Sequence, residues 1–192
     1  KEYFDDVRNE FRPSEDQVII NADFDVHNRT GRSRILTWGY KEDGRLDYST
    51  INSHYTATQV SGLTLVVKIG AGYRFTAALK NDGTVWAWGY NEYGQLGDGT
   101  TIDRTTPVQV SSLSGVVEIA SGYSHTAALK DDGTVWCWGN NSSGRLGDGT
   151  YANRNYPVQV SGLSGVVAIA SGYAHTVALK NDGTVWAWGD NN

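Results

Sequence analysis

Two histidines recur at one position of the sequence and are the first candidates for acid–base or metal chemistry. His125 and His175 lie 50 residues apart, and Phe75 stands 50 residues before His125. A catalytic or metal-binding imidazole cannot be exchanged for a phenyl ring in an equivalent working site, and one histidine per copy does not assemble a ligand cluster. We therefore expect these histidines to be structural, with each ring bonded to neighbouring backbone.

The aspartates form a second candidate group, because carboxylates bind calcium and cleave glycosidic bonds. They stand in Gly-Asp-Gly-Thr turns (Asp98, Asp148) or in hairpins (Asp82, Asp132, Asp182), where the side chain can bond the local backbone. No stretch has the spacing of a calcium-binding loop, and each carboxylate that could act in glycoside hydrolysis already has a turn role. There is also no nucleophile elbow, phosphate loop or HExxH. We predict no catalytic residue, no metal site, no cofactor and no enzyme activity.

The single cysteine, the charge balance and the hydropathy argue against an internal disulfide, nucleic-acid binding and a membrane span. Cys137 cannot form a disulfide within the chain, and it holds the place of Ala87 and Ala187 in neighbouring copies, so we expect a small buried residue. The net charge of -5 opposes binding to nucleic acid, which depends on clustered Lys and Arg. No apolar run reaches the roughly 20 residues of a membrane span. No leader pattern begins at Lys1, so we expect a cytosolic or already processed chain.

These residues belong to a sequence that repeats every 50 residues. Trp38, Trp88, Trp138 and Trp188 mark the period, and 26 of 39 positions are identical between 72–110 and 122–160. Within a copy, short apolar and β-branched runs are joined by Asp-Gly, a strong hairpin signal because its turn needs positive φ. In the third copy we expect strands over 116–120, 126–130, 134–139 and 157–160.

Each copy is therefore expected to form a sheet of four antiparallel strands. Alternation places Trp136 and Trp138 on one face of the third strand, and Val135 and Cys137 on the other. Pro157 at the start of the fourth strand suits an edge, because proline donates nothing to a ladder. Such sheets must stack to bury their apolar faces, as the blades of a propeller do. We predict an all-β fold, an incomplete or small β-propeller of about 3.5–4 blades.

The repeat resembles a known family. The stretches GYSHTAALKDDGTVWCWGNNSSGRLGDGT (122–150) and GYAHTVALKNDGTVWAWGDNN (172–192) closely resemble the regulator of chromosome condensation repeat, and the resemblance covers about 35–192. It implies an interaction platform, which usually closes as seven blades. Members include a chromatin-bound nucleotide exchange factor for a small GTPase, a plant ultraviolet-B photoreceptor and secreted bacterial proteins, among them a β-lactamase inhibitor. The near-identical copies look most like the bacterial members, which implies an extracellular or cell-surface location, with the cytoplasm as the alternative.

Two activities of family members can be compared with residues of this chain. The photoreceptor has a Gly-Trp-Arg-His-Thr motif, and its tryptophan positions correspond here to Tyr73, Tyr123 and Tyr173. Ultraviolet sensing is therefore not expected. The exchange-factor activity depends on loops of that member that cannot be mapped onto this sequence, and the acidic balance opposes nucleosome binding.

The chain divides into a non-repeat segment and four units. Residues 1–33 do not match the repeat. Within them, Phe4, Val7 and Phe11 have the spacing of a short helix ending near Pro13, with a flexible leader as the alternative, and residues 17–26 could form a strand. The repeats occupy 34–192, as a partial blade (34–65), two blades (66–115 and 116–165) and a blade without its fourth strand (166–192).

Seven such blades would need about 350 residues, so three explanations are open. The chain is a fragment of a longer protein, it closes as a small propeller of about four blades, or it completes itself with other chains. An unclosed blade presents an unpaired apolar edge, which invites strand addition. Residues 17–26 could fill the outer place of the last blade, in their own chain or in a neighbour.

Positions that vary between otherwise matching copies are the candidates for recognition, because packing fixes the others. They lie after Gly-Tyr, after the third strand, and over 101–106, which is matched by 151–156. The candidate partner-binding residues are Arg74, Phe75, Tyr90, Glu92, Tyr93, Ser124, His125, Tyr151 and Tyr156. Tyrosine is favoured at protein interfaces and where sugars stack.

We predict a non-enzymatic module that binds a protein partner, or further copies of itself through the open blade edge. The alternative is a carbohydrate-binding cell-surface module that takes a glycan. A third possibility, by family analogy, is a regulator of a small GTPase or of an enzyme.

Overall fold

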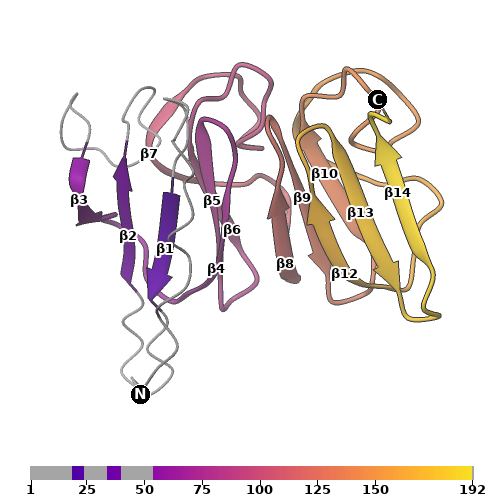
Figure 1. Ribbon diagram of the computed structural model, residues 1–192, viewed down its shortest axis with the longest axis horizontal. Coiled ribbons are helices and arrows are strands. Elements are labelled where there is room, and N and C mark those ends of the chain that lie inside the picture. The colour runs from indigo at the N-terminus through magenta and orange to yellow at the C-terminus, as the bar shows by residue number, and fades with distance from the viewer. Residues whose placement is uncertain (1–18, 24–33, 40–53, 192) are drawn as a thin grey trace, which may run out of the picture.

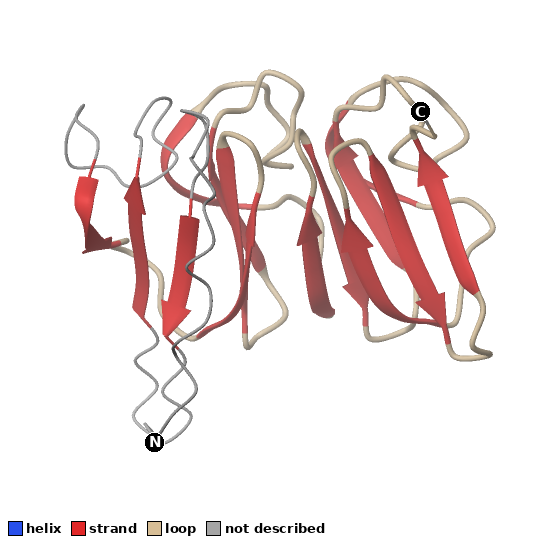
Figure 2. Cartoon of the chain, in the orientation of Figure 1, coloured by secondary structure: helices blue, strands red, loops and turns tan. Residues whose placement is uncertain are grey.

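The computed structural model describes residues 19–23, 34–39 and 54–191. In this part of the chain every regular element is a strand, and the strands form four antiparallel sheets that stand side by side (Figure 1). Figure 2 shows strands and loops without a helix in the described ranges, which confirms the all-β prediction. Consistently, none of the described residues forms a helix long and apolar enough to cross a membrane. The helix predicted near Phe4 lies outside the described residues.

The sheets follow one another along the chain. The first contains β1 (Ile19–Asp23), β2 (Arg34–Gly39) and β3 (His54–Gln59). The second contains β4 (Val66–Ala71), β5 (Phe75–Lys80), β6 (Val85–Gly89) and β7 (Arg104–Gln109). The third contains β8 (Val116–Ser121), β9 (His125–Lys130), β10 (Val135–Gly139) and β11 (Arg154–Gln159). The fourth contains β12 (Val166–Ser171), β13 (His175–Lys180) and β14 (Val185–Gly189), and within each sheet a strand pairs with the next one along the chain.

Asp-Gly turns join the second and third strands of the later sheets, as the sequence predicts. Asp82 Oδ1 accepts hydrogen bonds from the backbone N–H of Thr84 (3.0 Å) and from its hydroxyl (2.6 Å). Gly83 follows with φ of 75°, a conformation that costs glycine little. Asp132 and Asp182 bond the threonine two residues later in the same way. The hairpin aspartates therefore have a structural role.

Two strands differ from the expectation. β11 begins at Arg154, so Pro157 lies inside the strand and not at its start. The sheet tolerates proline there because β11 pairs only with β10 and is an edge strand. β1 does not complete the last blade, because it pairs with β2 in the first sheet, with Ile19 opposite Trp38.

The core lies between the sheets, which confirms that the blades stack. Between the second and third sheets, Leu79 and Val85 from one side meet Trp138 and Ala128 from the other. The clusters on either side repeat this arrangement. The cluster between the first two sheets includes Ile35, Val60, Val66, Ala78 and Trp88, and the cluster between the last two includes Leu129, Val135, Cys137, Ala178 and Trp188. The predicted alternation also holds, because Trp138 packs toward the second sheet whereas Val135 and Cys137 pack toward the fourth.

Two valines at the same position of successive sheets allow the contribution of this stacking to the free energy of unfolding to be measured. Val135 is 0% exposed, whereas Val185, at the same position of the last sheet, is 66% exposed. We expect Val135→Ala to lower the free energy of unfolding by about 2 kcal/mol, and Val185→Ala to lower it by less than about 0.5 kcal/mol. Urea unfolding of the two variants measures both values. Equal losses would show that the outward face of the fourth sheet is covered in solution.

Candidate functional site

The variable residues gather at one end of the blades. β4 and β6 run in the same direction, since β5 lies antiparallel between them, so the loops that follow them share an end of the sheet. We call this the loop end; it comprises residues 72–74, 90–103, 122–124 and 140–153, and it lies at the top of Figure 1. The Asp-Gly hairpins lie at the opposite end. Arg74, Tyr90, Glu92 and Tyr93 from the second sheet, and Tyr151 from the third, therefore share one surface.

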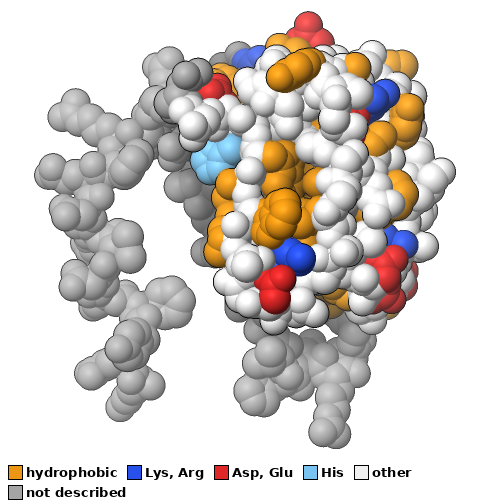
Figure 3. All heavy atoms as spheres, turned by 90° about the vertical axis from the view of Figure 1, so that its right-hand side faces the viewer, with side chains coloured by type: hydrophobic (Ala, Val, Ile, Leu, Met, Phe, Trp, Pro, Cys, Tyr) orange, Lys and Arg blue, Asp and Glu red, His pale blue; other side chains and the backbone are white. Residues whose placement is uncertain are grey.

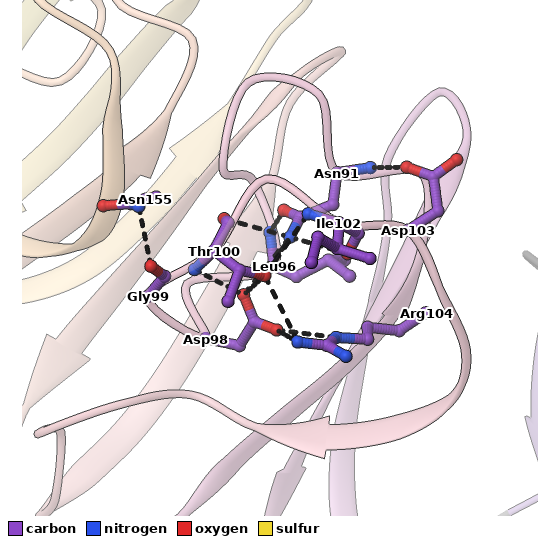
Figure 4. Close-up of polar contacts among 9 residues, drawn as sticks. All are labelled: Asn91, Leu96, Asp98, Gly99, Thr100, Ile102, Asp103, Arg104 and Asn155. Carbon is purple, nitrogen blue, oxygen red and sulfur yellow. Dashed lines mark hydrogen bonds and ion pairs between the residues drawn. The ribbon is translucent and has the colours of Figure 1, made fainter.

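A buried asparagine holds the long loop of the second sheet (Figure 4). The side chain of Asn91 is 0% exposed, and its Oδ1 accepts a hydrogen bond from the backbone N–H of Leu96 (2.9 Å). Its Nδ2 donates to the carbonyls of Thr100 and Ile102 (3.1 Å each) and to Asp98 Oδ1 (3.2 Å). Asn141 makes the corresponding bonds in the third sheet, at 3.0–3.1 Å. The two loops therefore have the same internal network of hydrogen bonds around a buried asparagine, which we call the frame.

An ion pair completes the frame. Arg104 Nη2 lies 2.7 Å from Asp98 Oδ2, and Asp98 Oδ1 accepts bonds from the N–H (2.9 Å) and hydroxyl (2.7 Å) of Thr100. Burial alone would raise the pKa of Asp98, but the bonds from Thr100 and Arg104 outweigh it and hold that pKa below its ordinary value. Asp148 and Arg154 form the same pair at 2.8 Å. The aspartate of Gly-Asp-Gly-Thr is a loop-closing residue, and no group of three potential metal ligands occurs among the residues that the structure describes.

The frame exposes different side chains in the two loops. Tyr151 is 76% exposed, where the preceding copy has Thr101. Ile102 is 61% exposed, where the following copy has Ala152. The sequence comparison marked 101–106 as variable but did not single out Ile102. A large aliphatic residue in a polar Thr-x-Asp stretch is the signal that could have identified it.

An aromatic cluster lies beside the long loop of the second sheet. The Arg74 guanidinium carbon lies 5.5 Å from the ring centre of Tyr73 and 5.7 Å from that of Tyr90. Tyr90 packs edge-on against Tyr93, and its hydroxyl donates to the Glu92 carboxylate. The structure thus brings together four of the residues that the sequence marked as candidates.

The Gly-Tyr tyrosines form a ladder across the blades, which the sequence did not reveal. The rings of Tyr73 and Tyr123 are stacked with centres 4.1 Å apart, and Tyr173 follows at 4.3 Å. Burial, and then its tyrosine neighbours, raise the pKa of Tyr123 well above its ordinary value. The Tyr123 hydroxyl therefore stays protonated at physiological pH.

Three predicted contact residues are not available to a partner, and this corrects the sequence analysis. Phe75 and His125 are 0% exposed and Ser124 is 4% exposed, because β5 and β9 are covered by the following sheets. A Cβ atom at Gly72 or Gly122 would overlap the ring three residues later, so these glycines leave room for the ring. A glycine three residues before each ring was the sequence feature that could have indicated that the ring is buried. Tyr156 is 48% exposed but lies in the outer strand β11, apart from the loop end.

His125 and Cys137 are structural, as predicted, although the histidine has a different partner. His125 Nε2 lies 3.0 Å from the hydroxyl of Thr176 in the next sheet, where we expected a bond to neighbouring backbone. Cys137 is fully buried, and this burial raises the pKa of its thiol. Neither group is placed to react with a ligand.

The buried His125 predicts a pH-dependent stability. Burial, with smaller effects of the Arg145 and His175 charges, lowers the pKa of His125 to about 3, against 6.5 for a free side chain. Between these values the unfolded chain binds a proton that the folded chain does not, so stability is full above about pH 6.5 and falls as the pH is lowered. At pH 5 the loss is about 2 kcal/mol.

His125→Phe, which copies Phe75, should remove this slope between pH 7 and pH 5. Urea unfolding at several pH values, compared with the unchanged chain, measures it. Parallel pH profiles for the two proteins would contradict a neutral buried histidine.

Comparison with known proteins identifies the repeat. Residues 82–129 and 132–179 each match the regulator of chromosome condensation (RCC1) repeat, and a second description of that repeat matches 66–95 and 116–145. Together these matches span more than half of the chain. No curated protein sequence matches this chain significantly.

Solved structures share the fold. Human WBSCR16 superposes with a TM-score of 0.70 at 23% identity, over 83% of this chain and 45% of that protein. Yeast RCC1 (Prp20), in complex with Kap60, gives a TM-score of 0.68 at 23% identity, over 81% of this chain and 39% of that protein. Saccharomyces cerevisiae Prp20p, described together with its binding to Gsp1p and histones, gives 0.70 at 22% identity, over 82% and 41%. The chain spans less than half the length of these propellers. The chain belongs to the regulator of chromosome condensation repeat family.

Proposed function

We propose that this chain is a non-enzymatic protein-interaction module that binds its partner through the loop end. One observation carries the proposal: two successive loops have the same hydrogen-bonded frame but expose different side chains. Residues that packing does not fix are free to specify a partner, and binding residues are commonly placed on loops held by a rigid scaffold.

The composition of the loop end supports a protein partner. It offers tyrosines and an arginine, residue types that are enriched in the energetically important parts of protein interfaces. Arg74 and Glu92 add charges of both signs beside the rings of Tyr90 and Tyr93. Yeast RCC1 (Prp20), a protein that contains this fold, is found in a crystal structure with Kap60 bound to it.

Capture with matched variants tests the proposal. The chain is immobilised, incubated with an extract of its source organism and chemically cross-linked. We expect a discrete, saturable protein that is captured about tenfold less by the triple variant Tyr90→Ala, Tyr93→Ala and Tyr151→Ala. Tyr156→Ala removes a tyrosine from the outer strand and should capture normally. Normal capture by the triple variant, or equal loss in both variants, would contradict binding at the loop end.

Carbohydrate binding is the second candidate, because the Tyr151 ring is 76% exposed and could stack on a sugar. Mono- and disaccharides added during capture separate the two proposals. A protein-binding surface keeps its partner in their presence. Release of the partner by a simple sugar would instead assign the loop end to glycans.

A further inference from the structure

Tyr151 is the most exposed large apolar side chain in the described part of the chain, at 76%. It lies at the loop end, between the Gly-Asp-Gly-Thr turn and the start of β11. Figure 3 views the molecule from the side of the fourth sheet and shows hydrophobic side chains that reach the surface at the top, where the loop end lies. An aromatic ring left in water on a loop is a candidate for burial in a pocket of a partner.

The backbone on both sides of Tyr151 is held by one buried side chain. Asn141 Nδ2 donates to the carbonyl of Thr150 (3.0 Å) before it and to the carbonyl of Ala152 (3.1 Å) after it. The N–H of Ala152 donates to the Thr150 hydroxyl (3.3 Å), and Asn153 Oδ1 accepts from the N–H of Asn141 (2.8 Å). The exposed segment therefore has a fixed conformation around its central residue.

The peptide groups of Tyr151 itself are left open. Among the residues that the structure describes, neither its N–H nor its carbonyl makes a hydrogen bond, whereas the carbonyls before and after it are both bonded to Asn141. The loop therefore presents an aromatic side chain together with the unbonded carbonyl of the same residue. A pocket that bound only the ring would make no use of that carbonyl.

An aromatic side chain and its own carbonyl are the two groups that one class of enzyme binds together. A serine endopeptidase of the chymotrypsin type takes the side chain into its primary pocket and the carbonyl oxygen into its oxyanion hole. We infer that the loop around Tyr151 binds in the active site of such an endopeptidase and inhibits it, with the Tyr151 ring in the primary pocket. The inference rests on the proposed binding at the loop end and names the class of partner.

The bonds from Asn141 explain why this loop inhibits the enzyme and is not consumed. On acylation the serine oxygen bonds the Tyr151 carbonyl carbon, the bond from that carbon to the Ala152 nitrogen breaks, and the serine proton passes through the histidine to that nitrogen. Both new ends remain tied to Asn141, through the carbonyls of Thr150 and Ala152. The amine therefore stays beside the acyl carbon and re-forms the peptide bond before water replaces it.

The corresponding loop of the second sheet has the same frame but a different central residue. Asn91 Nδ2 donates to the carbonyls of Thr100 and Ile102 (3.1 Å each), and Thr101 lies between them. A threonine side chain does not fill a pocket that is shaped for an aromatic ring. The third sheet is therefore the one whose loop should inhibit, and Tyr151 is the residue that selects the enzyme.

Inhibition of chymotrypsin by the whole chain tests the inference, with hydrolysis of a small chromogenic peptide as the readout. We expect an inhibition constant of about 1 µM or lower. Tyr151→Ala should raise it about 100-fold or more, and Tyr156→Ala, in the outer strand, should leave it unchanged. Tyr151→Lys should transfer the inhibition to trypsin, whose primary pocket contains an aspartate. No inhibition at about 100 µM chain, or equal inhibition by Tyr151→Ala, would overturn the inference.

The role of the frame is measured by cleavage. Chymotrypsin should cut Asn141→Ala after Tyr151 about tenfold faster or more than it cuts the unchanged chain, as followed by mass spectrometry. Equal and rapid cleavage of both would show that the loop is a substrate, against the inference. The exchange of specificity by Tyr151→Lys does not depend on how well the Asn141 variant folds.

Failure here is distinguishable from failure of the proposed function. A chain that captures a protein through the loop end and leaves chymotrypsin active retains the proposed function and overturns this inference. Inhibition that is lost in Tyr151→Ala supports both, because it requires binding at the loop end.

Discussion

Trp138→Ala should lower the free energy of unfolding by about 4 kcal/mol. The side chain is 0% exposed, it lies in the cluster between the second and third sheets, and its Nε1–H donates to the Gln95 carbonyl at 2.9 Å. Truncation therefore leaves a large cavity and removes one of two hydrogen bonds to the Gln95 carbonyl, which keeps the bond from the Thr126 hydroxyl (3.1 Å). The approach is so close that a Cβ atom at Gly97 would lie 2.7 Å from that nitrogen. Urea or guanidinium unfolding measures the loss.

The control for this variant is a tryptophan of the same repeat in an open position. Trp186 lies in β14 of the fourth sheet and is 49% exposed. We expect Trp186→Ala to cost less than about 1 kcal/mol. Similar losses for both tryptophans would mean that stacking between sheets is not what holds the blades together.

Asn91→Ala should cost about 3 kcal/mol and should disorder the long loop of the second sheet. The variant removes the donor to two carbonyls and to Asp98, and it removes the acceptor for Leu96 N–H, all around a side chain that is 0% exposed. Hydrogen exchange should accelerate over 91–103 and stay unchanged over 141–153, where Asn141 maintains an equal frame. The exchange experiment therefore contains its own reference.

Asn81→Ala provides the matched substitution at an exposed asparagine in the hairpin. It should change the free energy of unfolding by less than about 0.5 kcal/mol. If Asn91→Ala were equally mild and left exchange over 91–103 unaltered, the frame would not be what shapes the loop end.

Much of the fold follows from local pattern. The 50-residue period, the Asp-Gly turns and the alternation of Trp138 with Cys137 are properties of single copies, so the sequence predicts the sheets and the two faces that they bury. Pro157 is predicted at the edge strand, although β11 starts three residues earlier. The place of β1 was not predicted, because Ile19 and its neighbours do not match the repeat and their partner is set by tertiary pairing.

The site was harder to predict, since exposure depends on the adjoining sheet. Variation between copies marked Arg74 and Tyr90, which the structure brings together at the loop end, but it also marked Phe75 and His125, which are buried. The buried position varies although it lies between sheets, where His125 Nε2 is 3.0 Å from the hydroxyl of Thr176 in the next sheet. Comparison of copies cannot separate exposed from buried variable positions without knowing which residues meet between sheets.

A loop exchange tests most directly whether the hydrogen-bonded frame of a loop and its contact surface are separable. The double variant Tyr151→Thr and Ala152→Ile gives the third sheet the exposed side chains of Thr101 and Ile102 and leaves Asn141, Asp148 and Arg154 in place. The measurement is the dissociation constant for the captured protein, with the free energy of unfolding determined alongside. We predict that unfolding changes by less than about 0.5 kcal/mol while the dissociation constant rises about tenfold. An unchanged dissociation constant in a stably folded variant would contradict the claim that the exposed loop residues select the partner.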